Sequence, residues 1–242
     1  MNNTLKINHT VHFSEVDCNY NLRFDSIIST FQKITLYHSN DLKVDAESLL
    51  KNSNAFWVLT KMKVKINRLP KITDNITIET WPSTVTPVRF NREFRLGINN
   101  DYDVMGSSEW VTLDYTTKTL RRTETIAYPF DMEHRTDVSG AGEFSRKREK
   151  VCESDLINKH TVRFVDIDPN NHTNNVAYVR MALNAFTVEE FSNANFKEFE
   201  IQYISQTYFG DEIEIYKRKT DYGYYVEGQL KGKTTFICIF KI

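Results

Sequence analysis

The chain has 242 residues, of which 40% are hydrophobic and 26% charged, values that are ordinary for a globular protein. Its 31 Lys and Arg against 32 Asp and Glu give a formal charge of -1, which argues against nucleic-acid binding through a general basic field. No apolar run approaches the roughly 20 residues of a membrane span, and the first residues lack a signal-peptide core. We therefore expect a cytoplasmic protein without a membrane span.

The spacing of apolar residues predicts two helices and several strands. In chain order, we expect a helix around residues 27–38, strands over 75–81, 90–96 and 109–113, a second helix over 176–186, and strands over 212–216, 224–230 and 234–240. Lys231-Gly232-Lys233 is predicted to form a tight hairpin turn. The second helix is apolar around most of its circumference and is therefore expected to be buried.

An internal repeat relates the two halves of the chain. Residues 11–21 (VHFSEVDCNYN) match residues 162–172 (VRFVDIDPNNH), and both segments carry an acid-x-Asp-x-Asn pattern before a predicted helix. Downstream, residues 74–78 match residues 211–215, and the different spacing predicts an insertion around residues 43–54. The repeat predicts two curved antiparallel sheets, each wrapped around a buried helix. We place the N-terminal unit over 1–122, a linker over 123–155 and the C-terminal unit over 156–242.

The second copy of the repeat holds the candidate catalytic residues. Asp168, Asn170 and His172 are spaced so that an extended or looping chain can direct all three side chains to one side. A carboxylate and an imidazole can act as base or nucleophile, while an amide and the N–H groups of the next helix can polarise a carbonyl. The alternative is that these residues only form a turn and cap the helix. The first copy has Asn21 where His172 stands, which favours one active site in the second half.

These residues resemble the active-site signature of the acyl-acyl carrier protein (acyl-ACP) thioesterases of plants and bacteria. Residues 163–178 (RFVDIDPNNHTNNVAY) are similar to the family pattern R-x-x-D-x-D-x-N-x-H-x-N-N-x-x-Y, and residues 56–62, 70–81 and 110–119 resemble further family segments. The resemblance implies an α+β fold with two tandem hot-dog domains. It also implies release of free fatty acid by thioester hydrolysis, with Asp168, Asn170 and His172 as catalytic residues.

The family has a catalytic Glu, often followed by Cys, about one strand after the motif. Here Gln206 stands at the Glu position and Thr207 at the Cys position. An amide can orient a water molecule but cannot exchange a proton at neutral pH, so this residue departs from the family mechanism. Glu200 is the nearest acid of the same strand parity and is a second candidate.

The resemblance also predicts the binding partner and the acyl site. Phe31, Ile34 and Trp57 are expected to line a tunnel for the acyl chain, although core packing explains each of them as well. The expected partner is acyl carrier protein with its fatty acyl-phosphopantetheine, docked by one of the basic clusters at 121–122, 146–148 or 217–219. We expect no nucleic-acid partner, and a monomeric pseudo-dimer or a homodimer.

No cofactor or metal is expected, because no group of Cys, His, Asp and Glu has metal-ligand spacing. His38 is expected to pack or cap within the first helix. Two alternatives to acyl-ACP hydrolysis stay open. One is an acyl-CoA thioesterase on the same fold, and the other is a catalytically silent acyl-binding regulatory protein, which the Gln at position 206 allows.

Overall fold

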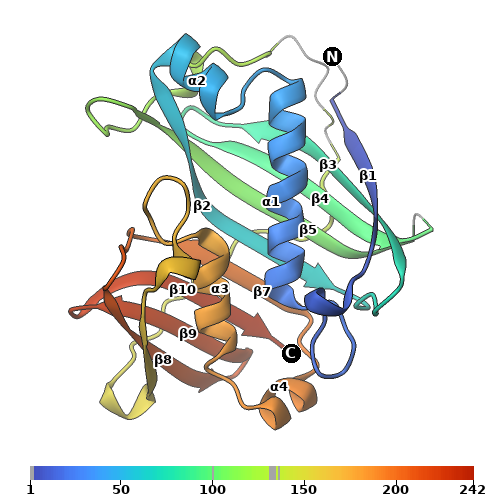
Figure 1. Cartoon of the computed structure of the whole chain (residues 1–242), viewed down its shortest axis with the longest axis vertical. Coiled ribbons are helices and arrows are strands. Elements are labelled where there is room, and N and C mark those ends of the chain that lie inside the picture. Colours follow the sequence, from blue (N-terminus) through green and yellow to red (C-terminus); the bar gives the residue numbers. More distant parts are fainter. Residues whose placement is uncertain (1–2, 100, 131–134, 136) are drawn as a thin grey trace. The chain divides into compact units, whose positions relative to one another are not determined.

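The computed structural model describes residues 3–99, 101–130, 135 and 137–242, and the chain forms two compact units, Met1–Gly142 and Glu143–Ile242. The first unit is an antiparallel sheet with a long helix across one face (Figure 1). Its strands lie in the order β1-β3-β4-β5-β2. The elements are β1 (Leu5–Thr10), α1 (Phe24–Asp41), α2 (Ala46–Ser53), β2 (Ala55–Ile66), β3 (Asn75–Val85), β4 (Phe90–Ile98) and β5 (Asp101–Asp114).

The second unit repeats this architecture. Its strand order β6-β8-β9-β10-β7 is the first unit's order when the strands of each unit are numbered along the chain. The elements are β6 (Leu156–Thr161), α3 (Asn175–Leu183), α4 (Val188–Ala194), β7 (Glu198–Tyr203), β8 (Glu212–Thr220), β9 (Gly223–Leu230) and β10 (Lys233–Lys241). Short 3-10 helices at Phe13–Glu15 and Phe164–Asp166 precede α1 and α3. The predicted repeat and double hot-dog fold are confirmed.

The first unit is held together by the packing of α1 on the sheet. The Phe31 ring is fully buried and stacks on Phe94 of β4, with 4.4 Å between ring centroids. Gly106 of β5 leaves the space that this ring needs, since a Cβ built there would lie 2.3 Å from Phe31 Cε2. A glycine in the sheet therefore sets how closely the helix approaches. Residues 90, 92 and 94 of β4 face α1, because neighbours along a strand alternate between faces.

The second helix is shorter than predicted. The spacing suggested a helix over 176–186, but α3 ends at Leu183. The side chain of Thr187 accepts from the N–H of Glu190, and the Glu190 side chain accepts from the N–H of Thr187, so a capping box starts α4 there. Phe186 falls between the helices and packs edge-on against Phe240, with 4.9 Å between ring centroids. Phe186 fits the apolar spacing of the helix because it is a core residue, although it lies in the loop after α3.

The predicted insertion at residues 43–54 is wrong. This segment forms α2, which has a counterpart, α4, in the second unit. The difference in spacing arises from the elements on either side: α1 has 18 residues against 9 in α3, and β2 has 12 against 6 in β7. The predicted strands all lie within observed strands. The predicted turn is also confirmed, with positive φ at Lys231 (52°) and Gly232 (73°), as a type I′ hairpin requires.

The segment between the two sheets is tied to each of them by buried carboxylates. Glu93 lies on the β4 face opposite α1 and accepts from the backbone N–H (2.9 Å) and hydroxyl (2.5 Å) of Ser139. In the second unit, Glu200 accepts from the N–H of Ser145 at 2.8 Å. Both carboxylates are at most 5% exposed. Such charge-assisted hydrogen bonds hold the described parts of this segment against the outer faces of the sheets.

Candidate functional site

The predicted motif forms a tight loop closed by its own aspartate. Asp168 Oδ1 accepts from the backbone N–H of Asn170 (2.8 Å) and of His172 (3.2 Å). The Asp168 N–H donates to the His172 carbonyl at 2.9 Å, and Ile167 and Thr173 form a β-bridge across the base of the loop. The structure therefore brings the three predicted residues together, because one carboxylate oxygen organises the backbone of the other two.

The first unit builds the same loop without the histidine. Asp17 Oδ1 accepts from the N–H of Asn19 (2.8 Å) and of Asn21 (2.9 Å), and Val16 pairs with Leu22 across the base. The turn interpretation is thus correct for this oxygen in both units. What distinguishes the second loop is the imidazole that replaces the Asn21 amide.

Asp168 keeps a second oxygen outside this backbone scaffold. Oδ2 lies 3.5 Å from Asn170 Nδ2, at the limit of a hydrogen bond. The Asn170 side chain is exposed, and His172 is half-buried. The His172 ring packs edge-on against Tyr208, with 5.4 Å between centroids. The loop therefore presents a carboxylate oxygen, an amide and an oriented imidazole together.

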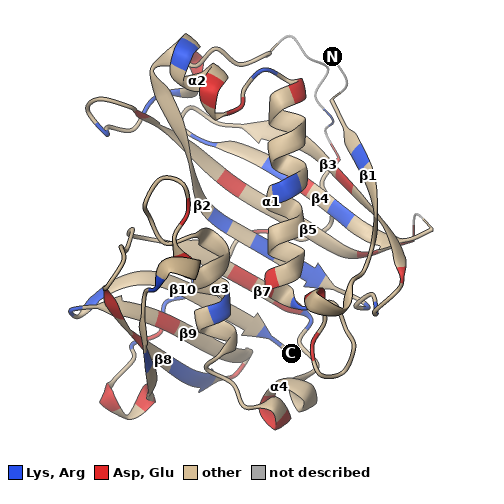
Figure 2. Ribbon diagram, in the orientation of Figure 1, with Lys and Arg blue, Asp and Glu red and all other residues tan. Residues whose placement is uncertain are grey.

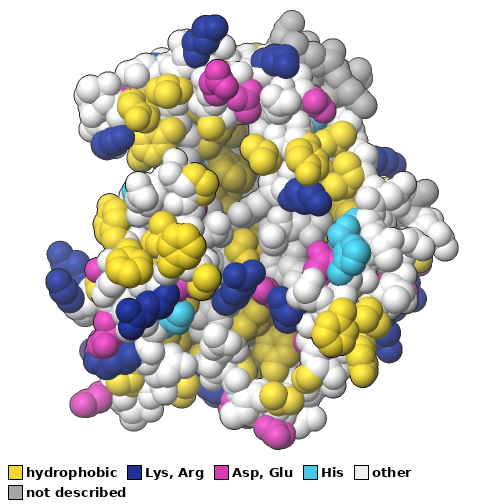
Figure 3. Space-filling view, viewed as in Figure 1, with side chains coloured by type: hydrophobic (Ala, Val, Ile, Leu, Met, Phe, Trp, Pro, Cys, Tyr) yellow, Lys and Arg dark blue, Asp and Glu magenta, His cyan; other side chains and the backbone are white. Residues whose placement is uncertain are grey.

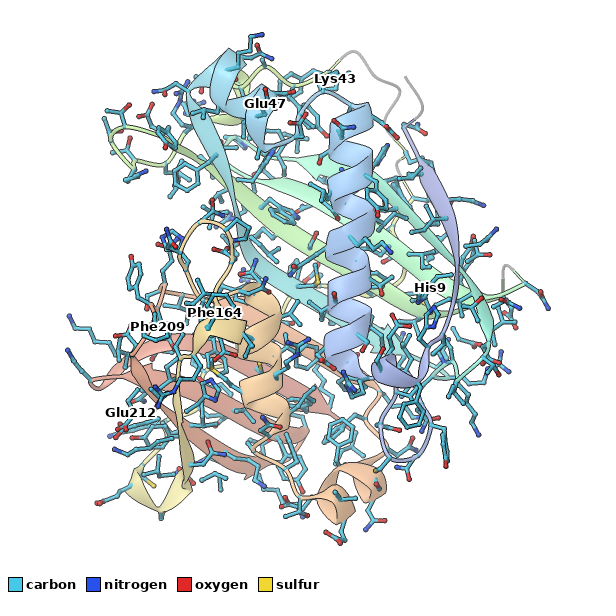
Figure 4. All side chains as sticks on the ribbon, in the orientation of Figure 1. His9, Lys43, Glu47, Phe164, Phe209 and Glu212 are labelled. Carbon is cyan, nitrogen blue, oxygen red and sulfur yellow. The ribbon has the colours of Figure 1, made fainter. Side chains whose placement is uncertain are left out.

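The first acid of each repeat has a structural role that the sequence reasoning missed. Asp166 Oδ2 lies 2.9 Å from His160 Nε2, and Glu15 Oε2 lies 2.7 Å from His9 Nε2 (Figure 4 labels His9). Burial would raise the pKa of the Glu15 carboxyl, but hydrogen bonds from the His12 N–H and from His9 outweigh it and lower the pKa. A histidine six residues before the acid in both copies was the available signal.

At the start of α3, the N-cap residue Asn174 accepts the hydrogen bonds of two backbone N–H groups. The side chain of Asn174 accepts from the Val176 N–H at 2.8 Å, and its carbonyl accepts from the Ala177 N–H at 2.9 Å. The expectation that first-turn N–H groups polarise a substrate carbonyl is therefore wrong for these two groups. The exposed Asn170 amide, earlier in the loop, is a further donor.

The segment with the predicted Gln206 runs beside the motif loop. The Thr173 N–H donates to the Thr207 carbonyl at 2.9 Å. Thr207 is fully buried: its N–H donates to Tyr178 OH at 3.0 Å, and its hydroxyl lies 2.7 Å from that of Thr173. Burial raises the pKa of the Tyr178 phenol. Gln206 is exposed, and its side chain makes no hydrogen bond to any residue that the structure describes.

Glu200, the second candidate for the catalytic acid, forms hydrogen bonds with residues outside the motif loop. Besides the Ser145 N–H, it accepts from Gln202 Nε2 at 2.7 Å. Its neighbours Phe199 and Ile201 are fully buried on the opposite side of β7. Glu200 therefore anchors the segment that enters the second unit.

The three predicted acyl-binding residues lie on the inner side of the first unit. Phe31 and Ile34 of α1 are fully buried. Trp57 of β2 is half-buried, donates from Nε1 to the Val44 carbonyl at 2.7 Å, and packs edge-on against Phe90. Packing explains the position of each, and their contact with an acyl chain stays a prediction.

Charges of both signs are spread over the ribbons of each unit (Figure 2). Most of the basic clusters considered as docking sites are paired with acids. The ion pairs are Arg121–Asp114 (3.1 Å), Arg122–Glu124 (2.8 Å), Lys147–Asp221 (3.8 Å), Lys217–Glu190 (2.7 Å) and Arg218–Asp155 (2.7 Å). Arg146 and Arg148 are exposed. Within the described residues, no helix is long and apolar enough to cross a bilayer, and no group of three His, Cys, Asp or Glu is arranged to hold a metal ion.

Models of two protein domains match most of the chain: the acyl-ACP thioesterase N-terminal domain at residues 2–127 and the C-terminal domain at residues 149–237. The chain belongs to the acyl-ACP thioesterase family. An acyl-[acyl-carrier-protein] hydrolase of Cuphea viscosissima is 24% identical over 199 residues, which cover 78% of this chain and 48% of that protein. The chain spans about half the length of the curated family members it matches.

Solved structures of the family share the fold. An acyl-ACP thioesterase from Bacteroides thetaiotaomicron superimposes with a TM-score of 0.88 at 19% identity, covering 99% of this chain and 97% of that one. The 12:0-ACP thioesterase of Umbellularia californica gives 0.85 at 15% identity, covering 100% and 97%. These similarities extend the double hot-dog architecture over the whole chain.

Proposed function

We propose that the chain hydrolyses the thioester of fatty acyl-ACP and releases the free fatty acid. The observation that carries the proposal is the second-unit loop, where Asp168, Asn170 and His172 are gathered on a scaffold that the first unit reproduces without an imidazole. Membership of the acyl-ACP thioesterase family supports the substrate class.

The geometry supports one role for each side chain. Asp168 Oδ2, to which no backbone group of the described residues donates, accepts a proton from a water molecule as that water attacks the thioester carbonyl carbon. The Asn170 amide donates to the carbonyl oxygen as it becomes negative. His172 then gives a proton to the sulfur as the carbon–sulfur bond breaks, which yields a fatty acid and a thiol. The proton held by Asp168 returns to His172, so that both residues regain their starting states. Direct attack by Asp168 Oδ2 on the carbonyl is the alternative, and it would pass through an acyl-enzyme anhydride.

Gln206 fits an auxiliary role on this pathway. Its amide is exposed on a segment bonded to the motif loop and can hold the water without exchanging a proton. We expect Gln206→Ala to lower kcat less than His172→Ala does.

The test is hydrolysis of acyl-ACP substrates of increasing chain length by wild type, Asp168→Asn, His172→Ala and Asp17→Asn. Asp17→Asn is the matched control, because it perturbs the equivalent loop scaffold in the first unit. We expect the two second-unit variants to lose on the order of 10²–10⁴ in kcat, and Asp17→Asn to retain wild-type kcat within about threefold. Equal losses in Asp168→Asn and Asp17→Asn would reduce Asp168 to a structural residue.

The same assay separates the alternatives. A rate advantage of acyl-ACP over acyl-CoA that disappears at high salt supports the carrier protein as partner, since salt screens charge steering. Equal rates on both substrates favour an acyl-CoA thioesterase. Acyl-chain binding without turnover at any length overturns the proposal and favours a silent acyl-binding protein.

A further inference from the structure

The inner face of the first unit contains a buried cation. Arg92 lies on β4 between Phe90 and Phe94, and it shares their face toward α1. It is only 7% exposed. Arginine is almost never buried to this extent without a charged partner.

The hydrogen bonds of Arg92 go to uncharged groups. Nη1 donates to Thr80 Oγ1 at 3.2 Å and lies 2.9 Å from His38 Nδ1. A guanidinium has only donors, so it donates to a His38 nitrogen that carries no proton. Among the described residues, no carboxylate forms an ion pair with Arg92, and its Nε and Nη2 make no hydrogen bond.

Within the described residues, the charge of Arg92 is therefore incompletely balanced. His38 is in the last turn of α1, whose carbonyl end is equivalent to about half a negative charge. Burial lowers the pKa of Arg92 to about 10, so the side chain is still a cation at neutral pH. A buried charge is costly unless a partner of opposite sign is present.

Aromatic side chains extend from the guanidinium along the same face. Phe90 packs against Trp57 and Tyr128, with 4.9 Å between ring centroids in both pairs. Thr112 pairs in register with Trp57 and is fully buried, and its hydroxyl makes no hydrogen bond within the described residues. Figure 3 shows the surface of this unit hollowed beside α1 and below α2, with hydrophobic side chains in the hollow.

We propose that the inner face of the first unit binds a carboxylate carried at the end of an apolar chain, with Arg92 as its charge partner and the aromatic side chains in contact with the chain. A carboxylate accepts two hydrogen bonds from the planar guanidinium and supplies the missing negative charge. A phosphate would satisfy the charge equally, but it would not use the apolar wall that leads away from Arg92.

Two ligands carry this chemistry. One is a free fatty acid. The other is an acyl thioester with a second carboxyl at its far end, in which case the site selects dicarboxylic acyl chains. Only the second source rests on the proposed thioesterase activity, because fatty-acid binding is an equilibrium property of the folded chain.

The experiment is isothermal titration calorimetry of the full chain with hexadecanoic acid, its methyl ester and the primary alcohol of the same length, each below its solubility limit. We expect wild type to bind the acid at least tenfold more tightly than the ester or the alcohol. Arg92→Met should remove this preference and change ester binding by less than about threefold. Arg95→Met is the matched control, since it lies on the opposite face of the same strand and should retain the preference.

Two results would overturn the proposal. One is equal affinity of wild type for acid, ester and alcohol, a comparison that needs no variant. The other is an Arg92→Met protein whose melting temperature falls by more than 10 °C while its preference for the acid persists, which would make Arg92 a structural residue. A folded Arg92→Met should melt at or above the wild-type temperature, since an unbalanced buried charge has been removed.

Hydrolysis assays then distinguish the two sources. A higher kcat/KM for an ω-carboxyacyl-ACP than for the unsubstituted acyl-ACP of equal length, lost in Arg92→Met, assigns the site to the substrate. Equal values, with tight binding of the free acid, assign it to the fatty acid. A failure of all hydrolysis with acid binding intact would count against the proposed function alone.

Discussion

Substitution of Gly106 by alanine tests the packing of α1 on the first sheet. The new Cβ would lie 2.3 Å from Phe31 Cε2, whereas ordinary contacts fall at 3.4–4 Å, so the ring must move by roughly 1 Å. Phe31 has no exposed surface and is stacked on Phe94 at 4.4 Å, so it has no free space to enter. Overpacking of this kind costs about 1–3 kcal/mol. For a chain of this size, that corresponds to a melting temperature lower by about 2–12 °C.

The assay is urea unfolding of wild type, Gly106→Ala, Phe31→Leu and the double variant. Phe31→Leu alone should destabilise by about 1–2 kcal/mol, through the lost ring contacts. In the double variant the leucine leaves room for the new methyl group. The double variant should therefore lose less unfolding free energy than the sum of the two single losses, by about 0.5–3 kcal/mol. An alanine variant as stable as wild type, or losses that simply add, would refute the claim that this glycine sets the helix–sheet distance.

Three further outcomes are expected. Tyr178→Phe removes the phenol that accepts from the buried Thr207 N–H, so the urea midpoint should fall by the equivalent of about 1–3 kcal/mol, and an unchanged midpoint would contradict that contact. Ser139→Ala removes a hydroxyl donor to the buried Glu93 carboxylate and should cost about 1.5–3 kcal/mol in the same assay, whereas exposed Ser154→Ala should cost less than about 0.5 kcal/mol. The pKa of Glu15 is lowered in the folded chain, so its stabilising effect is complete above the unfolded carboxyl pKa of about 4.3 and is lost as pH falls through the folded value. The urea midpoints of wild type and Glu15→Gln should therefore differ at pH 7 and converge on acidification, and a constant difference would exclude this linkage.

The fold could be predicted from the sequence because the spacing of apolar residues and the internal repeat indicated the same order of strands and helices in both halves. Period-two segments became strands, and the repeated acid-x-Asp-x-Asn pattern became two loops of the same geometry. Element lengths were harder to predict. Phe186 continues the apolar spacing of α3 although it lies outside the helix, because a core residue can be buried from a loop. The extra length of the first unit lies in α1 and β2, where no Pro, Gly or composition change marks it.

The candidate site was predictable as a set of residues but not as a geometry. The spacing of Asp168, Asn170 and His172 placed them in one loop, as observed. It did not show that one Asp168 oxygen holds the backbone and the other does not. The alternation of Phe90, Arg92 and Phe94 places Arg92 on the apolar face of its strand, but it does not show that this cation is buried there. Its burial depends on tertiary neighbours that come from two other elements, His38 of α1 and Thr80 of β3.

Two units with the same strand order are part of one polypeptide chain, so one gene encodes both. In a homodimer every substitution appears in both subunits, so a histidine that suits one loop must be tolerated in its symmetry mate. Here a mutation at codon 172 leaves codon 21 untouched, and selection can act on each loop alone. The doubling of α1 relative to α3 and the single imidazole are both departures that strict symmetry would have forbidden. Because the two loops are encoded separately, one can serve as a structural turn while the other carries the imidazole.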